Sequence, residues 1–180
     1  TMISHGLTPG ALFLLVGMLY ERRHTYELAA YRGVWKAIPV FGGLFVAAAF
    51  ASIGLPGFSG VVGEVLTLLG ACVTSRWYAV VAATGVILAA VYLLWAVQRA
   101  LTGEPDEESS GMPEINVREL CTVVPLLGLS LFLGFYPKPV LDRVEPTIAA
   151  LVEHVDRRSD YDEPSVEVRE APAVAEEGQE

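Results

Sequence analysis

Long stretches of this sequence carry no formal charge. If histidine is taken as neutral, the charge-free runs are residues 1–20, 37–63, 77–98 and 120–137 of the 180-residue chain. A soluble domain of this size needs charged residues over most of its surface, yet 53% of these residues are hydrophobic. A bilayer core of about 30 Å is crossed by roughly 20 apolar helical residues, which satisfy their backbone groups internally. The missing charge therefore excludes an ordinary soluble domain and predicts membrane-spanning helices.

Cysteine is scarce as well. Cys72 and Cys121 both lie in apolar sequence, and their spacing fits neither a disulfide framework nor a metal site. The chain also has no phosphate-binding loop, no nucleophile triad and no basic patch for nucleic acid. These absences leave the chain without redox chemistry of its own.

The net charge of −9 is concentrated at one end. From residue 151 onward there are ten acidic and three basic residues, which account for −7 of that charge. Proline, glutamate and small residues dominate this end and bury little apolar area. Residues 156–180 are therefore expected to form a disordered acidic tail.

The apolar runs predict an all-α integral membrane protein, a transmembrane helix bundle over residues 1–136. The expected helices cover about 1–20, 37–75 with an interruption near 54–60, 77–99 and 118–136. The loop at 100–117 is polar and turn-rich, and we expect it to lie in water. The intervening basic residues Arg22 and Arg23, with His24, are expected to anchor at the lipid headgroups, and Arg99 to reach them by snorkelling.

Residues 137–155 predict an amphipathic C-terminal helix. Its apolar residues fall on one helical face, namely Val140, Leu141, Val144, Ile148, Leu151, Val152 and Val155. Such a helix lies along the membrane surface or against a neighbouring subunit. We favour the subunit contact.

The interrupted segment allows two topologies. A continuous helix over 37–75 would be about 58 Å long, too long for one upright crossing, whereas each half is at the short limit for a span. One crossing places six Lys and Arg residues in the cytoplasm and three outside, and two crossings place seven inside and two outside. The charge count alone mildly favours two crossings.

The most informative residue is Glu64, the one charged residue between Lys36 and Arg76. It follows a helix break formed by Gly54, Pro56, Gly57 and Gly60. An intramembrane carboxyl is costly unless it is protonated, paired or hydrated, and broken helices are tolerated where protein or water satisfies the freed backbone. This combination indicates proton or ion movement at Glu64, with a structural hydrogen-bonded carboxyl as the alternative.

His5 is the second candidate for proton transfer. It lies inside the first apolar run, and an imidazole exchanges protons at cellular pH. Ser4 and Thr8 are within helical reach as hydrogen-bond partners. Taken alone, His5 is as well explained by a structural hydrogen bond as by a relay.

These residues resemble the NuoM/ND4 subunit of respiratory complex I. The similarity covers residues 1 to about 155, and its segments are Ser4–Leu7, Gly10–Gly17, Leu19–Arg22, Ala51–Gly57, Gly60 with Val62–Glu64, and Gly134–Pro137. Relatives in the wider group, including Mrp-type sodium/proton antiporters, more often have lysine where this chain has Glu64. Family chains are much longer, and this sequence resembles their last third, so we expect it to be a fragment.

The resemblance implies a role for the chain. His5 and Glu64 would belong to the output half of a proton channel in a proton-translocating NADH:quinone oxidoreductase, and the broken helix would cross the membrane once. The chain itself would hold no cofactor, since FMN, iron–sulfur clusters and quinone belong to other subunits. Its partners would be the bilayer and the adjacent antiporter-like subunits of the membrane arm, in the plasma (inner) membrane of a prokaryote.

Two other functions remain open from the sequence. The chain could belong to a sodium/proton antiporter of the Mrp type. It could also be a structural piece that packs against partners without transport of its own, because the glutamate and lysines of the input half are missing.

Overall fold

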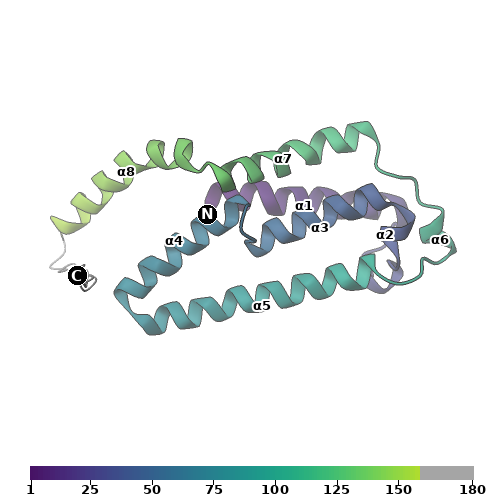
Figure 1. Ribbon diagram of the computed structural model, residues 1–180, viewed down its shortest axis with the longest axis horizontal. Helices are drawn as coiled ribbons and strands as arrows, with labels where there is room; N and C mark the ends of the chain where they lie inside the picture. The colour runs from purple at the N-terminus through teal and green to yellow at the C-terminus, as the bar shows by residue number, and fades with distance from the viewer. Residues whose placement is uncertain (159–180) are drawn as a thin grey trace, which may run out of the picture.

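The chain folds into a bundle of α-helices, and the computed structural model describes residues 1–158 (Figure 1). The elements are α1 (Met2–Arg23), the 3-10 helix η1 (Leu28–Ala30), α2 (Val34–Ala37), α3 (Pro39–Ile53), α4 (Ser59–Thr74), α5 (Arg76–Leu101), α6 (Glu107–Ser110), α7 (Val117–Phe135) and α8 (Lys138–Asp156). Within the described residues the structure is all-helical, as the apolar runs predicted. The disordered tail predicted for 156–180 lies, from residue 159 on, outside the described residues.

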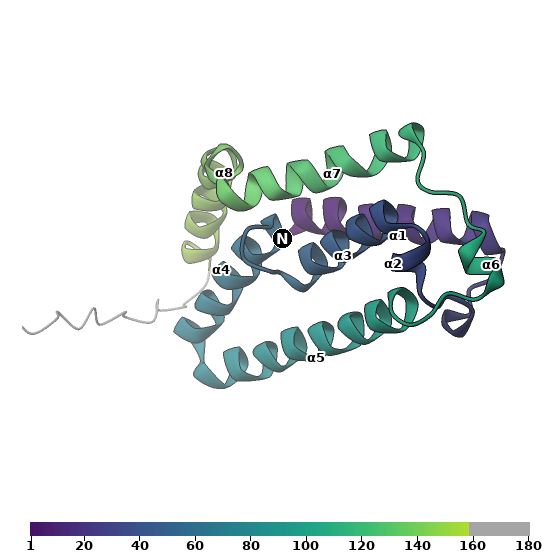
Figure 2. The ribbon, with the colours of Figure 1, turned by 45° about the vertical axis from the view of Figure 1, so that its right-hand side comes forward.

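Three of these helices, α1, α5 and α7, are long and apolar enough to cross a membrane. The apolar helices α3 and α4 are shorter, with 15 and 16 residues. They run in the same direction in both views, so the chain does not turn back at Pro56 as a hairpin would (Figures 1 and 2). The two halves together form one interrupted passage through the bundle.

The core lies where α3 is enclosed by its neighbours. Helices α1 and α7 pack on one side of α3 and α5 packs on another (Figure 2). The buried apolar residues at these contacts include Ala11, Leu15, Met18, Phe41, Phe45, Ala48, Val123 and Leu127. Most of α5 is exposed, with Ala79, Ala100 and Leu101 as its buried residues.

The connections at one end of the bundle are more ordered than the sequence suggested. The 100–117 segment, a turn-rich loop by its sequence, contains α6 and buries Ser109, Met112 and Ile115. Asp106 caps α6 by accepting a hydrogen bond from the Ser109 amide at 2.7 Å. The other residues of this segment are mostly exposed, so its expected place in water stays a prediction, and the packing of three residues against the helix ends is what its composition does not reveal.

Helix α8 stands apart from the bundle (Figure 1). None of its residues is buried, and its apolar side chains are exposed, with Leu151 at 61% and Ile148 at 52%. Apart from its start at Val140, which is half-buried, the apolar face predicted from the sequence is therefore left uncovered by the rest of residues 1–158.

Candidate functional site

The break between α3 and α4 is built by glycine and proline. Gly54 ends α3 with a φ of 80°, and Gly57 has a φ of 107°, both in the left-handed region that favours glycine. The Leu55 amide donates to the Phe50 carbonyl at 3.1 Å, and the Phe58 amide donates to the Leu55 carbonyl at 3.1 Å. These turns end one helix and allow the next to begin at Ser59.

Glu64 lies directly against this break. A Cβ atom built on Gly54 would overlap the Glu64 carboxylate and lie 2.8 Å from its Cδ atom. Gly54 therefore leaves the space that the carboxylate occupies, in addition to adopting its unusual backbone conformation. The Glu64 side chain forms no hydrogen bond or ion pair with any other residue among 1–158.

His5 and Glu64 line the same small cavity, between α1, α3 and α4. The cavity has a volume of about 70 Å³, and its polar lining also includes Thr8 and Ser52. One water needs roughly 10–15 Å³ of such volume, so the cavity has room for a few. The structure thus brings together the two residues that the sequence singled out, 59 positions apart, around a space suited to water.

Three buried serines join the helices beside this cavity. The Ser59 hydroxyl donates to the Ser4 hydroxyl at 3.0 Å and lies 3.0 Å from the Ser130 hydroxyl. The Thr8 hydroxyl donates to the Ser4 carbonyl at 3.1 Å. Ser4 and Thr8 thus use their hydroxyls within this cluster, and neither forms the bond to His5 that the sequence allowed. The cluster links α1, α4 and α7 at the level of the break.

Helix α7 also approaches the break closely at Gly134. A Cβ atom there would lie 2.6 Å from the Phe58 carbonyl carbon, so any larger residue would collide with the connecting backbone. Gly57 faces the ring of Phe135 at the same contact. The segment that ends α3 is therefore held by α7 as well as by its own turns.

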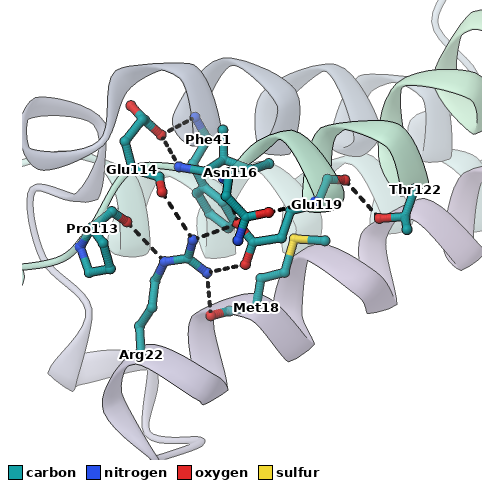
Figure 3. A network of polar contacts seen from close by, with 9 residues as sticks. Met18, Arg22, Phe41, Pro113, Glu114, Asn116, Glu119 and Thr122 are labelled. Carbon is teal, nitrogen blue, oxygen red and sulfur yellow. Dashed lines mark hydrogen bonds and ion pairs between the residues drawn. The ribbon is translucent and has the colours of Figure 1, made fainter.

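The opposite end of the bundle is held by Arg22 (Figure 3). Its guanidinium donates to both carboxylate oxygens of Glu119, at 3.0 Å and 2.8 Å, and to the carbonyls of Met18 and Pro113. The side chains of Arg22 and Glu119 are 7% and 13% exposed. Glu114 completes the junction by accepting from the amides of Phe41 and its neighbour Val40.

The sequence suggested that Arg22 and Arg23 anchor at the lipid headgroups, and the structure shows them paired inside the protein instead. Arg23 pairs with Asp106 at 3.1 Å, donates to the Ser109 hydroxyl at 3.0 Å, and is 8% exposed. Both arginines point into the protein because acidic residues about 90 positions later lie beside them. A pairing over such a distance leaves no local signal in the sequence.

Comparison of the sequence with known proteins identifies its family. The family described as "NADH:quinone oxidoreductase/Mrp antiporter, TM" matches residues 1–90, half of the chain. The chain belongs to this family. The matching residues include His5, the whole helix break and Glu64.

Curated relatives place the chain within one branch of the NADH:quinone oxidoreductase/Mrp antiporter family. It is 44% identical to NADH-quinone oxidoreductase subunit M of Rhodobacter capsulatus over 154 residues, which cover 85% of this chain and 30% of that protein. It is 41% identical to the Mycobacterium tuberculosis subunit M over 82% of the chain, and 42% identical to NADH-ubiquinone oxidoreductase chain 4 of Prototheca wickerhamii over 78%. It is thus similar to subunit M, the NuoM/ND4 type, and spans less than a third of the length of these relatives.

The polar contacts at the Arg22 end of the bundle can be tested through Asp106. Hydrogen bonds from the Ser109 hydroxyl and amide, together with Arg23, lower the pKa of Asp106 to about 2. Because this pKa is depressed in the folded state, the ionised carboxylate stabilises the fold above the ordinary pKa of about 4, and this contribution is lost as pH falls toward 2.

We therefore expect Asp106→Asn to flatten the pH dependence of stability between about pH 4 and pH 2. The measurement is the melting temperature of the full-length protein in detergent across that range, for wild type and variant. Asp142→Asn, at an exposed pair in α8, serves as the control. Parallel curves for wild type and Asp106→Asn would contradict the assignment.

Proposed function

We propose that this chain forms the output half of a proton path in the membrane subunit M of a proton-translocating NADH:quinone oxidoreductase. The supporting observation is that His5 and Glu64 line one cavity at the break of a discontinuous helix. A proton would reach His5 from a part of the path outside this chain, pass to Glu64, and leave on the far side of the break. Quinone reduction elsewhere in the complex would drive the cycle.

The chemistry of the cavity suits reversible proton transfer. The Glu64 carboxyl is half-buried and has no fixed partner among residues 1–158, so neither its charged nor its neutral form is locked by a neighbour. An imidazole and a carboxyl that share a small hydrated space can exchange a proton directly or through one water. Ionisable residues inside membranes usually mark such pathways.

The distribution of basic residues supports a direction for the proposed transfer. At the end of the bundle where α1 and α5 end and α7 begins, the helix ends and their connecting loops hold six Lys and Arg residues. At the other end, Arg76, Lys138 and Arg143 lie close to a span, and Arg157 and Arg158 follow only after α8. The positive-inside rule places the first end in the cytoplasm, in agreement with a single passage for α3 and α4. Glu64, beyond the break, then faces the periplasmic side of a prokaryotic plasma membrane.

The proposed partners are the adjacent antiporter-like subunits of the membrane arm. Helix α8 presents an uncovered apolar face, which suits a contact with a neighbouring subunit. FMN, iron–sulfur clusters and quinone are proposed to be held by other subunits. The chain would then contribute to the oxidoreductase as a translocating subunit without redox groups.

A sodium/proton antiporter is the second candidate, because the matching family includes Mrp antiporters. Everted vesicles that contain the full-length protein distinguish the two. A pH gradient that forms on NADH addition and is unaffected by sodium supports the proposal. A gradient that sodium dissipates without NADH and with complex I inhibitors present would favour the antiporter.

His5 provides a separate test of the path. We expect His5→Ala in the full-length protein to lower NADH-driven proton translocation about tenfold, since a positioned acid–base group contributes about 10²–10⁴-fold and water in the cavity would offset part of the loss. His24→Ala is the matched control, because His24 lies at the opposite end of α1. Equal rates for His5→Ala and wild type, measured by vesicle acidification, would remove His5 from the path.

A further inference from the structure

A second hollow, unrelated to the helix break, lies at the basic end of the bundle. It has a volume of about 600 Å³ and lies between the η1 segment and the C-terminal end of α5. Its lining residues include Leu28, Arg32, Trp95, Gln98, Arg99 and Thr102. Two guanidinium groups therefore face one hollow to which residues 1–158 contribute no carboxylate.

The two walls of this hollow are fixed to each other. The Gly33 amide donates to the Thr102 carbonyl at 3.1 Å. Gly33 has a φ of 65°, and a Cβ atom there would lie 2.8 Å from backbone atoms of Glu104 and Pro105. This close backbone packing holds Arg32 beside the end of α5.

The two arginines of the hollow differ from three of the other basic residues at this end of the bundle. Arg22, Arg23 and Lys36 each pair with a carboxylate, whereas Arg32 and Arg99 form no ion pair within residues 1–158. The Arg99 guanidinium lies 5.0 Å from the centre of the Trp95 ring, which orients it without neutralising it. Two like charges that share a hollow favour an anion between them.

An apolar stripe leads away from the hollow along α5. Leu88, Val91 and Trp95 follow one another at helical spacing and are 65%, 60% and 52% exposed. Gln98 and Arg99 continue the same face. The face is thus apolar along the span and cationic at its end, which matches the chemistry of a phospholipid rather than that of a small soluble anion.

We propose that this hollow binds the phosphate of an anionic phospholipid, with Arg32 and Arg99 as its ligands and the acyl chains along the α5 stripe. The cluster of basic residues at this end places it at the cytoplasmic leaflet, where basic pockets beside spanning helices bind acidic headgroups. The site stands apart from His5 and Glu64, so it does not depend on the proposed proton path.

The test uses the full-length protein, purified, delipidated and titrated with phosphatidylglycerol in detergent, with bound lipid counted by native mass spectrometry. We expect Arg32→Gln and Arg99→Gln each to weaken the tightest phosphatidylglycerol binding about fivefold, and the double variant about thirtyfold. Replacement of both residues by lysine keeps the charge and should restore most of the binding. Arg76→Gln, which removes one charge from the other end of α5, should leave it unchanged.

Three results would overturn the site. Equal binding by wild type and the Arg32→Gln/Arg99→Gln variant would show that the hollow takes no lipid. Competition by millimolar glycerol phosphate would identify a site for soluble phosphate instead. Equal affinity for phosphatidylcholine would remove the requirement for an anionic headgroup. If the double variant does not fold, the two single variants decide the question by the same measurement.

Discussion

Glu64→Gln in the full-length protein is expected to abolish NADH-driven proton translocation through this subunit. Glutamine is close to glutamate in size and still forms hydrogen bonds, but it neither accepts nor releases a proton at cellular pH. Loss of a positioned acid–base group slows proton transfer about 10²–10⁴-fold, so the residual rate through this path should be at most about one per cent of the wild-type rate. The measurement is the rate of acidification of inverted membrane vesicles relative to the rate of NADH oxidation.

Two control variants make this result specific. Glu64→Asp keeps a carboxyl in a shorter side chain and should retain part of the translocation. Glu145→Gln removes a carboxylate from the exposed helix α8 and should have no effect. If Glu64→Gln leaves the ratio of protons translocated to NADH oxidised at its wild-type value, Glu64 is not on the path.

The helix break also makes the Glu64→Gln variant interpretable. The carboxylate occupies space left by Gly54 and forms no bond with another residue among 1–158, so an amide of nearly the same shape should fit without loss of stability. A melting temperature within a few degrees of wild type would confirm that the variant folds. A loss of translocation then reports on proton transfer rather than on the fold.

Much of the scaffold around this site could be predicted from local sequence. Apolar runs predict the spans because a chain in lipid must satisfy its backbone groups within a helix. Gly54, Pro56 and Gly57 predict the break because these residue types disfavour helix. Glu64 lies four residues after Gly60, so its position beside the break can also be predicted from the sequence. These features depend on residues that are close together in the chain.

The contacts that fix the bundle could not be predicted in this way. Ser4, Ser59 and Ser130 come from three helices and are ordinary residues in their own segments. Their bonds follow from how the helices pack, and packing depends on side-chain shapes across long sequence separations. The same is true of Arg22, whose partner Glu119 is 97 residues away.

Among the variants considered, loss of the ion pair between Arg22 and Glu119 is expected to lower stability most. We expect Glu119→Gln to lower the free energy of unfolding by about 3–5 kcal/mol, because it leaves the Arg22 charge buried without a counter-ion. The amide also accepts less strongly from the Asn116 backbone, whose 2.9 Å bond belongs to the cap of α7. The measurement is unfolding of the full-length protein in mixed detergent micelles.

An exposed ion pair at the same end of the bundle provides the matched control. Lys36 and Glu104 also pair, but their side chains are 57% and 85% exposed. Such pairs contribute about 0–1 kcal/mol, so Glu104→Gln should change stability little. Equal effects of Glu104→Gln and Glu119→Gln would show that burial does not decide the strength of these contacts.

A double variant separates the cost of an unpaired charge from the value of the pair. Arg22→Met with Glu119→Leu removes both charges, and a buried pair replaced by apolar residues is often close to neutral. Here we expect incomplete recovery, because Arg22 also donates to the carbonyls of Met18 and Pro113, which methionine cannot replace. A double variant less stable than Glu119→Gln alone would show that these backbone contacts, and not the ion pair, hold the end of α1 to α7.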